Sequence, residues 1–206
     1  MIFLAISFAF FSVYMNLLMD AEEKILCIQD ERNCRDYIKA FLKLSTDIEK
    51  LLVVRKYYQY NVFSNTIGIP NIESVKIIDI IKTLHEAGHY SVLNKYKIKF
   101  EVYKISQIVI SINRLFIIPL IMIMFIFLGE VCRLAVAFCL IATLLRIVIG
   151  ITNEYEASRI AFNFLKSRMG YEYIKIAKKI YIICFLNQLF MTFSIGFLML
   201  ALYYPK

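Results

Sequence analysis

The sequence predicts an all-α membrane protein with about four transmembrane helices. Three observations support this fold class: 60% of the 206 residues are hydrophobic, the mean hydropathy is +0.66, and long uncharged runs alternate with charged segments. A chain of this composition is far more apolar than an ordinary soluble domain of its size. We therefore expect the uncharged runs to lie in lipid and the charged segments to lie in water.

The first element is an uncharged run over residues 2–19, which is just long enough to cross a bilayer as a helix. A cleaved signal peptide would begin with basic residues and end at a small-residue cleavage site. Here no Lys or Arg precedes the run, and Asp20, Glu22 and Glu23 follow it. We expect residues 1–19 to be a retained transmembrane anchor.

A charged region follows over residues 20–104. Its first part, residues 22–56, has apolar residues at helical spacing and predicts an amphipathic helix. Residues 57–69 are aromatic and β-branched, which predicts a short extended segment and a candidate substrate-binding edge strand. After the turn at Pro70, Asn71 is a candidate N-cap for a helix that begins at residue 72. The charges of that helix make it unsuited to lipid.

Two further apolar runs, residues 115–128 and 134–151, are separated by only five residues. They predict a transmembrane hairpin over residues 105–152. The next segment, residues 153–179, is charged and largely helical in its pattern. A last apolar run over residues 180–204 predicts a fourth span within residues 180–206, long enough to cross with some tilt.

The distribution of basic residues predicts the orientation. Four spans place residues 20–104 and 153–179 on one side, and these segments hold 14 and 6 of the 24 Lys and Arg residues. The positive-inside rule makes that side cytoplasmic, in a multi-pass protein of the cell membrane. The net charge of +8 is then explained by an anionic inner leaflet, so membrane lipid is an expected partner. We expect no nucleic-acid partner, because no DNA- or RNA-binding signature accompanies the charge.

The cysteines do not form a recognisable framework. There are five of them, and none forms a CxxC pair. We expect them to be free cysteines that pack as small hydrophobic residues. They are Cys27, Cys34, Cys132, Cys139 and Cys184.

The two histidines of the chain stand in one motif, His85-Glu86-Ala87-Gly88-His89, on a predicted helix. Residues four apart lie one turn apart on the same face, so both imidazoles can bind one zinc ion at about 2.0–2.1 Å. Glu86 is then placed to accept the proton of a metal-activated water. The alternative is a pair of surface histidines on a charged helix.

A catalytic zinc site needs a third protein ligand, and no histidine remains to provide it. The segment after the third span supplies two candidates, Glu154 and Glu156, and the hairpin returns it to the side of the HExxH helix. Residues two positions apart on a helix cannot both point at one site. The spacing alone leaves the choice between them open.

The HEAGH motif, the hydrophobic hairpin and the segment NEYEASRIAF resemble the YugP-type neutral zinc metallopeptidases of bacterial membranes, from about residue 70 to the end. The resemblance implies that Glu154, the first Glu of EYEAS, is the third zinc ligand in a zincin-like, gluzincin-like site. A similar segment occurs in HtpX-like proteases, which usually carry Asp at the position of Ser158. Residues 20–70 do not resemble the family.

These observations together predict a membrane-bound zinc metallopeptidase that acts on a peptide or protein substrate, with Glu86 as the general base. Tyr90, Tyr155 and Arg159 are candidates for stabilising the oxyanion. One alternative is a catalytically inactive zinc-binding membrane protein with an assembly or binding role. The other is a transporter, suggested by Glu130, Arg133 and Arg146 near the ends of the predicted spans. The sequence shows neither the internal repeats nor the broken helices typical of transporters.

Overall fold

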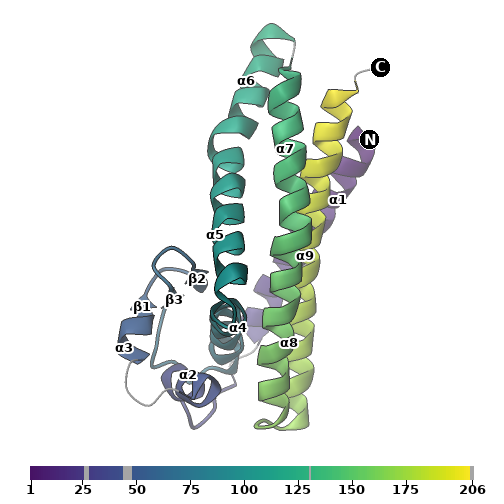
Figure 1. The fold of residues 1–206 in the computed structure, drawn as a ribbon. Helices are drawn as coiled ribbons and strands as arrows, with labels where there is room; N and C mark the ends of the chain where they lie inside the picture. Colours follow the sequence, from purple (N-terminus) through teal and green to yellow (C-terminus); the bar gives the residue numbers. More distant parts are fainter. Residues whose placement is uncertain (26–27, 44–47, 130, 205–206) are drawn as a thin grey trace. The chain divides into compact units, whose positions relative to one another are not determined.

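The computed structural model describes residues 1–25, 28–43, 48–129 and 131–204, and the chain is 78% helical (Figure 1). Four helical stretches in this part of the chain are long and apolar enough to cross a membrane. In number, length and composition they agree with the four expected spans, and they are compatible with a multi-pass membrane protein. Their bounds are Ile2–Glu22, Lys97–Leu128, Arg133–Lys166 and Tyr171–Tyr203.

The chain divides into two compact units that alternate along the sequence. The first, here called the hydrophobic unit, comprises Met1–Leu17, Val102–Thr152 and Cys184–Lys206. The second, here called the polar unit, comprises Leu18–Glu101 and Asn153–Ile183.

The hydrophobic unit is built from helices only. Its elements are α1 (Ile2–Ile25), α5 (Lys97–Ile112), η1 (Asn113–Ile117), α6 (Ile118–Leu128), α7 (Arg133–Leu145), η2 (Arg146–Ile151) and α9 (Tyr171–Tyr203), in whole or in part. Helix α6 ends at Gly129, whose φ of +66° lies in the left-handed region that favours glycine. This residue starts the turn of the expected hairpin. The buried core of the unit consists of Ile121, Val136, Cys139 and Met199.

Polar side chains inside the hydrophobic unit are paired. The hydroxyl of Ser12 donates to Asn187 at 2.5 Å, and the amide of Asn187 donates to Asn16 at 2.6 Å. Arg146 donates to the Gln188 side-chain oxygen at 2.8 Å, as expected of a polar group in an apolar setting. Glu130, which also suggested the transporter alternative, lies outside the described residues.

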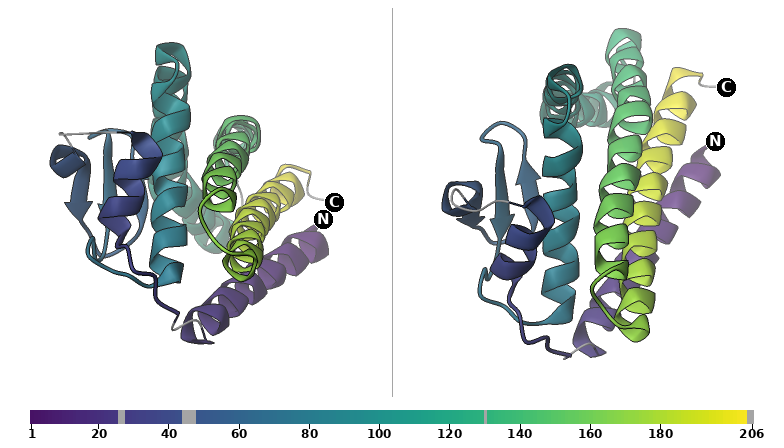
Figure 2. Two further views of the ribbon diagram at one scale, coloured as in Figure 1. Left: turned by 90° about the horizontal axis from the view of Figure 1, so that it is seen from below. Right: turned by 60° about the horizontal axis from the view of Figure 1, so that its bottom comes forward.

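The polar unit contains a small sheet that packs on a helix. Strands β1 (Leu52–Val54), β2 (Gln59–Asn61) and β3 (Thr66–Ile69) form a sheet of order β1-β3-β2, in which β1 is parallel and β2 antiparallel to β3. Helices α2 (Cys34–Leu42) and α4 (Ile77–Asn94) pack together, and β2 and β3 contact α4 (Figure 2). Short helix α3 (Ile48–Leu51) precedes β1. The second segment of the unit contains α8 (Thr152–Lys166) and the beginning of α9.

The structure corrects two expectations, which are a continuous helix over residues 22–56 and an all-α fold. The single amphipathic helix expected over residues 22–56 is wrong, because α1 ends at Ile25, α2 and α3 follow separately, and Leu52–Val54 is a strand. Helix α2 stops at Lys43, which adopts a left-handed φ of 54°. The extended segment expected over residues 57–69 is confirmed as β2 and β3. The chain is therefore mostly helical rather than all-α.

The start of α4 is also later than expected. The helix begins at Ile77, five residues beyond the expected start, and the Asn71 side chain instead accepts the Glu73 N–H at 3.1 Å within a turn. The Ile77 N–H donates to the Ile28 carbonyl at 3.0 Å. Pairing with the segment around Ile28 thus replaces the first expected turn of helix.

Candidate metal centre

Helix α4 carries both histidines of the motif on one face. His85 and His89 lie one turn apart, their rings meet edge to face with centroids 4.7 Å apart, and their Nε2 atoms are 3.2 Å apart. The side chains of His85 and His89 are only 12% and 6% exposed. They are therefore not surface histidines, which was the alternative interpretation of the motif.

Helix α8 brings Glu154 to the same point. Its Oε2 atom lies 3.1 Å from His85 Nε2 and 3.4 Å from His89 Nε2, and its side chain is 17% exposed. Among the described residues, these three form a group whose ligand atoms all lie within 4.8 Å of one another. The structure thus assembles the three ligands expected from the sequence into a cluster that could hold a metal ion.

The spacing of the three ligand atoms fits a tetrahedral ion. With bonds of about 2.0–2.1 Å, the ligand atoms of a tetrahedral zinc lie about 3.3–3.4 Å apart. The distances among His85 Nε2, His89 Nε2 and Glu154 Oε2 are 3.1, 3.2 and 3.4 Å. Two imidazoles and one carboxylate are also a donor set of catalytic zinc sites, which leave the fourth position to water.

The Nδ1 atoms of both imidazole rings, which are not the atoms that face Glu154, have partners on α8. The amide of Asn153 lies 2.7 Å from His89 Nδ1, and the hydroxyl of Ser158 lies 3.1 Å from His85 Nδ1. Glu154 and Ser158 are one helical turn apart, so a single face of α8 supplies both a ligand and a ring partner. Such contacts fix the orientation of metal-binding histidines.

A buried orphan atom supports the metal interpretation. Within the part of the chain that the structure describes, the Asn153 Oδ1 atom is buried without a hydrogen-bond partner. A half-turn of the amide would let this oxygen accept a hydrogen bond from His89 Nδ1–H and would place the amide NH2 where the oxygen now lies. The ring would then carry its proton on Nδ1 and present a free lone pair on Nε2, as a metal ligand must.

The electrostatics of the cluster favour a cation. Burial alone lowers the pKa of His89, but the charge of Glu154 and its hydrogen bond outweigh burial, so the pKa is raised. The charge of Glu86 adds to this effect. Positive charge is therefore stabilised at this point, whether it is a proton or a metal ion.

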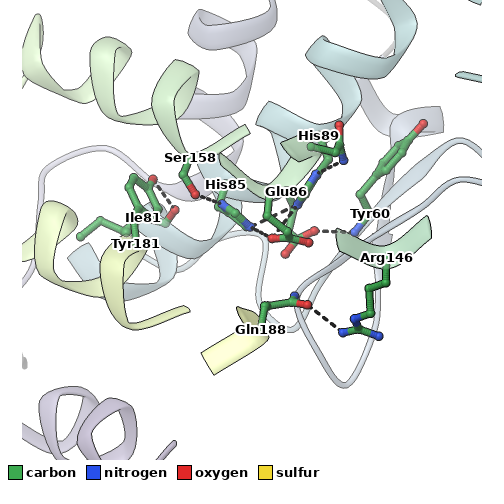
Figure 3. Close-up of polar contacts among 11 residues, drawn as sticks. Tyr60, Ile81, His85, Glu86, His89, Arg146, Ser158, Tyr181 and Gln188 are labelled. Atoms are coloured by element: carbon green, nitrogen blue, oxygen red, sulfur yellow. Dashed lines mark hydrogen bonds and ion pairs between the residues drawn. The ribbon is translucent and has the colours of Figure 1, made fainter. Parts of the chain in front are cut away.

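Glu86 lies on a different side of α4 from the histidines. Its Oε2 atom accepts the main-chain N–H of Tyr60, in strand β2, at 2.6 Å. Figure 3 shows its carboxylate near the histidine pair, and its electrostatic effect on His89 agrees with that position. The expected base therefore lies beside the histidine pair, on the side of α4 that faces the sheet.

The second carboxylate of the EYEAS segment is engaged elsewhere. Glu156 forms an ion pair with Lys99, and both side chains are about one-third exposed. Glu154 faces the histidines from the neighbouring face of α8. The choice that spacing left open is thus decided by the packing of α8.

The three candidates for oxyanion stabilisation are placed as follows. Tyr90 meets the ring of Tyr60 edge to face, with centroids 6.1 Å apart. Tyr155 is 55% exposed, and the Arg159 guanidinium lies 6.0 Å from the centre of its ring. Tyr155 and Arg159 therefore interact with each other on the surface of α8.

Sequence reasoning missed three contributors to the site. Asn153 precedes the ligand directly, and a polar residue beside a ligating glutamate was the available signal. Tyr181 packs its ring on His85, with centroids 5.7 Å apart, and donates to the Ile81 carbonyl at 2.9 Å. The Tyr60 N–H could not be found from the sequence, because a main-chain group leaves no residue-type signature.

Comparison of the chain with protein-family models, with curated proteins and with solved structures gave no match.

Proposed function

We propose that this chain is a membrane-bound zinc metallopeptidase whose metal is held by His85, His89 and Glu154. The convergence of these three ligand atoms, buried and at tetrahedral spacing, is the observation that carries the proposal. A glutamate adjacent to the first histidine on the same helix adds the group that a hydrolase needs. The resemblance to YugP-type peptidases supports the same assignment of ligands.

The chain's own residues have separate roles in the proposed reaction. When bound, zinc supplies Lewis-acid activation of a water molecule and of the scissile carbonyl. Glu86 accepts the proton of the attacking water and transfers it to the leaving amine nitrogen as the peptide bond breaks. Asn153 and Ser158 hold the imidazoles in the ligating orientation.

The proposed location is the cell membrane, with the site on the cytoplasmic side. Four helices are compatible with a multi-pass protein, and the polar unit carries most of the basic residues. The substrate is then a peptide or protein that reaches the site from that side.

Metal analysis and hydrolysis of the purified full-length chain in detergent test the proposal. We expect one zinc per wild-type chain, cleavage of fluorescein-labelled casein, and loss of both in a His85→Ala, His89→Ala double variant. A Lys99→Ala variant is a suitable control, because it alters a charged residue of the same unit away from the cluster.

The outcomes distinguish the alternatives. Absence of zinc from the wild type after addition of the metal would overturn the metal assignment. Stoichiometric zinc without cleavage of unstructured proteins would contradict the peptidase and favour a zinc-binding protein with an assembly role.

A further inference from the structure

One side of α4 runs along the β2–β3 hairpin. The residues on this side follow one another at intervals of three or four, which is the spacing of one helix face. Each of them contacts the hairpin or the segment that leads into it. They are Asp79 and Lys82 against Tyr58, Glu86 against the Tyr60 N–H, Tyr90 against the Tyr60 ring, and Asn94 against Asn65.

The far end of this face holds the hairpin in register. The Tyr60 hydroxyl donates to Asn65 Oδ1 at 2.6 Å, and the side-chain amides of Asn65 and Asn94 donate to each other at 3.2 and 3.1 Å. Asn65 has a φ of 51°, a left-handed conformation that asparagine tolerates better than most residues. The turn of the hairpin is thus tied to the last turn of α4.

Strand β2 is an edge strand, and its register decides which amides face outward. Tyr60 lies opposite Ile67, between the pairs Gln59–Gly68 and Asn61–Thr66. Successive residues of a strand direct their main-chain groups to opposite sides. The N–H of Tyr60 is on the side away from β3, because it donates to Glu86 and not to that strand. It is this outward N–H that reaches Glu86 at 2.6 Å.

We propose that the main-chain N–H of Tyr60 is a positioning group for the Glu86 carboxylate. This inference rests on the proposed function, in which Glu86 is the general base. The N–H holds Oε2 in a fixed place and leaves Oε1 for the proton of the attacking water. Because proton transfer depends steeply on geometry, a freely rotating carboxylate would act more slowly even with the metal in place.

The contact can be removed without removing a ladder hydrogen bond. Proline is tolerated in edge strands where its missing N–H would face outward, so Tyr60→Pro deletes the donor. It also deletes the phenol, and Tyr60→Ala, which keeps the N–H, is the matched control. We expect Tyr60→Pro to lower kcat at least tenfold relative to Tyr60→Ala, with KM within about threefold and zinc content equal. Equal kcat values, or loss of zinc from Tyr60→Pro alone, would overturn the inference.

A second measurement does not depend on activity. Hydrogen exchange of the Tyr60 amide, followed by NMR of the 15N-tyrosine protein, should be at least about tenfold faster in Glu86→Ala than in wild type, since the acceptor is lost. Asp79→Ala is the control, because Asp79 binds the Tyr58 hydroxyl and not a main-chain amide. Unchanged exchange in Glu86→Ala would refute the positioning contact. Faster exchange in Glu86→Ala together with an inactive wild type would refute only the peptidase.

Discussion

A β-carbon placed on Gly88 would lie 2.5 Å from the carbonyl oxygen of Ala157 and 3.0 Å from its carbonyl carbon. The fourth residue of the HEAGH motif therefore lies directly against the backbone of α8 within the polar unit. No side chain can be accommodated there by a rotamer change, because both atoms belong to the backbone. Close approach at this point lets Glu154 reach the two histidines.

The first prediction concerns this contact. Gly88→Ala should force α8 away from α4 and separate Glu154 from the histidine pair. We expect a loss of roughly 1–3 kcal/mol in stability, as for other overpacked sites, and weaker zinc binding. Thermal unfolding and metal titration measure the two effects. Gly170→Ala is the control, since a β-carbon there would meet its nearest atom at 3.9 Å; equal behaviour of the two variants would contradict the prediction.

The second prediction distinguishes the two glutamates of the EYEAS segment. Glu154→Ala removes a ligand and should weaken zinc binding by more than about 100-fold, which exceeds the usual effect of losing a residue behind a ligand. Glu156→Ala breaks only a partly exposed ion pair with Lys99 and should change zinc affinity little. Competition with a chromogenic chelator gives both affinities. The reverse order would mean that Glu156 is the ligand.

The third prediction concerns the base. Glu86→Gln keeps the shape of the side chain and an oxygen that can accept the Tyr60 N–H, but it removes the proton acceptor. We expect kcat to fall by about 10²–10⁴-fold while one zinc per chain is retained. Steady-state hydrolysis with parallel metal analysis decides the matter, and full activity in this variant would show that another group accepts the proton.

The fourth prediction tests the orientation of the Asn153 amide. If its oxygen accepts a hydrogen bond from His89 Nδ1–H, Asn153→Asp retains an acceptor and should bind zinc at least as tightly as the wild type. Asn153→Ala removes the acceptor and should weaken binding about 10–100-fold. Metal titration of the two variants checks this. An Asp variant that binds as poorly as the Ala variant would indicate that the amide donates instead.

The fifth prediction concerns Cys34, which is fully buried between α2 and α4. Burial raises the pKa of its thiol to about 11, although the neighbouring Thr83 side chain partly opposes this. The group therefore stabilises the fold below its ordinary pKa of about 8.5, and this contribution is lost as pH rises toward 11. A variant with Cys34 as its sole cysteine should react with iodoacetamide very slowly at pH 8, and faster with each unit up to about pH 11. Rapid alkylation of the folded protein at pH 8 would refute this assignment.

The sequence predicted the cluster of His85, His89 and Glu154 better than the elements around it. The interval between His85 and His89 determines their convergence through helix geometry alone, and both lie in the described helix. The choice between Glu154 and Glu156 depended on which face of α8 meets α4. That face is set by tertiary packing at Gly88 and Ala157, which no local pattern reveals.

The sheet was predicted only in part, for a physical reason. Strand β1 contains three residues, Leu52–Val54, too few to show an alternating pattern, and it directly follows residues with helical propensity. Its extended form comes from pairing with β3, a contact with residues fifteen positions away. Similarly, residues 72–76 have helical spacing but instead pair with the segment around Ile28.

His85 and Glu154 lie on either side of the hydrophobic hairpin, 69 positions apart in the sequence. During synthesis the histidine motif leaves the ribosome long before the glutamate does. Until the hairpin and the segment after it have been synthesised, the nascent chain contains the two histidines without Glu154. If the chain is the proposed peptidase, this order of the sequence means that its site cannot be complete before the hairpin has been synthesised.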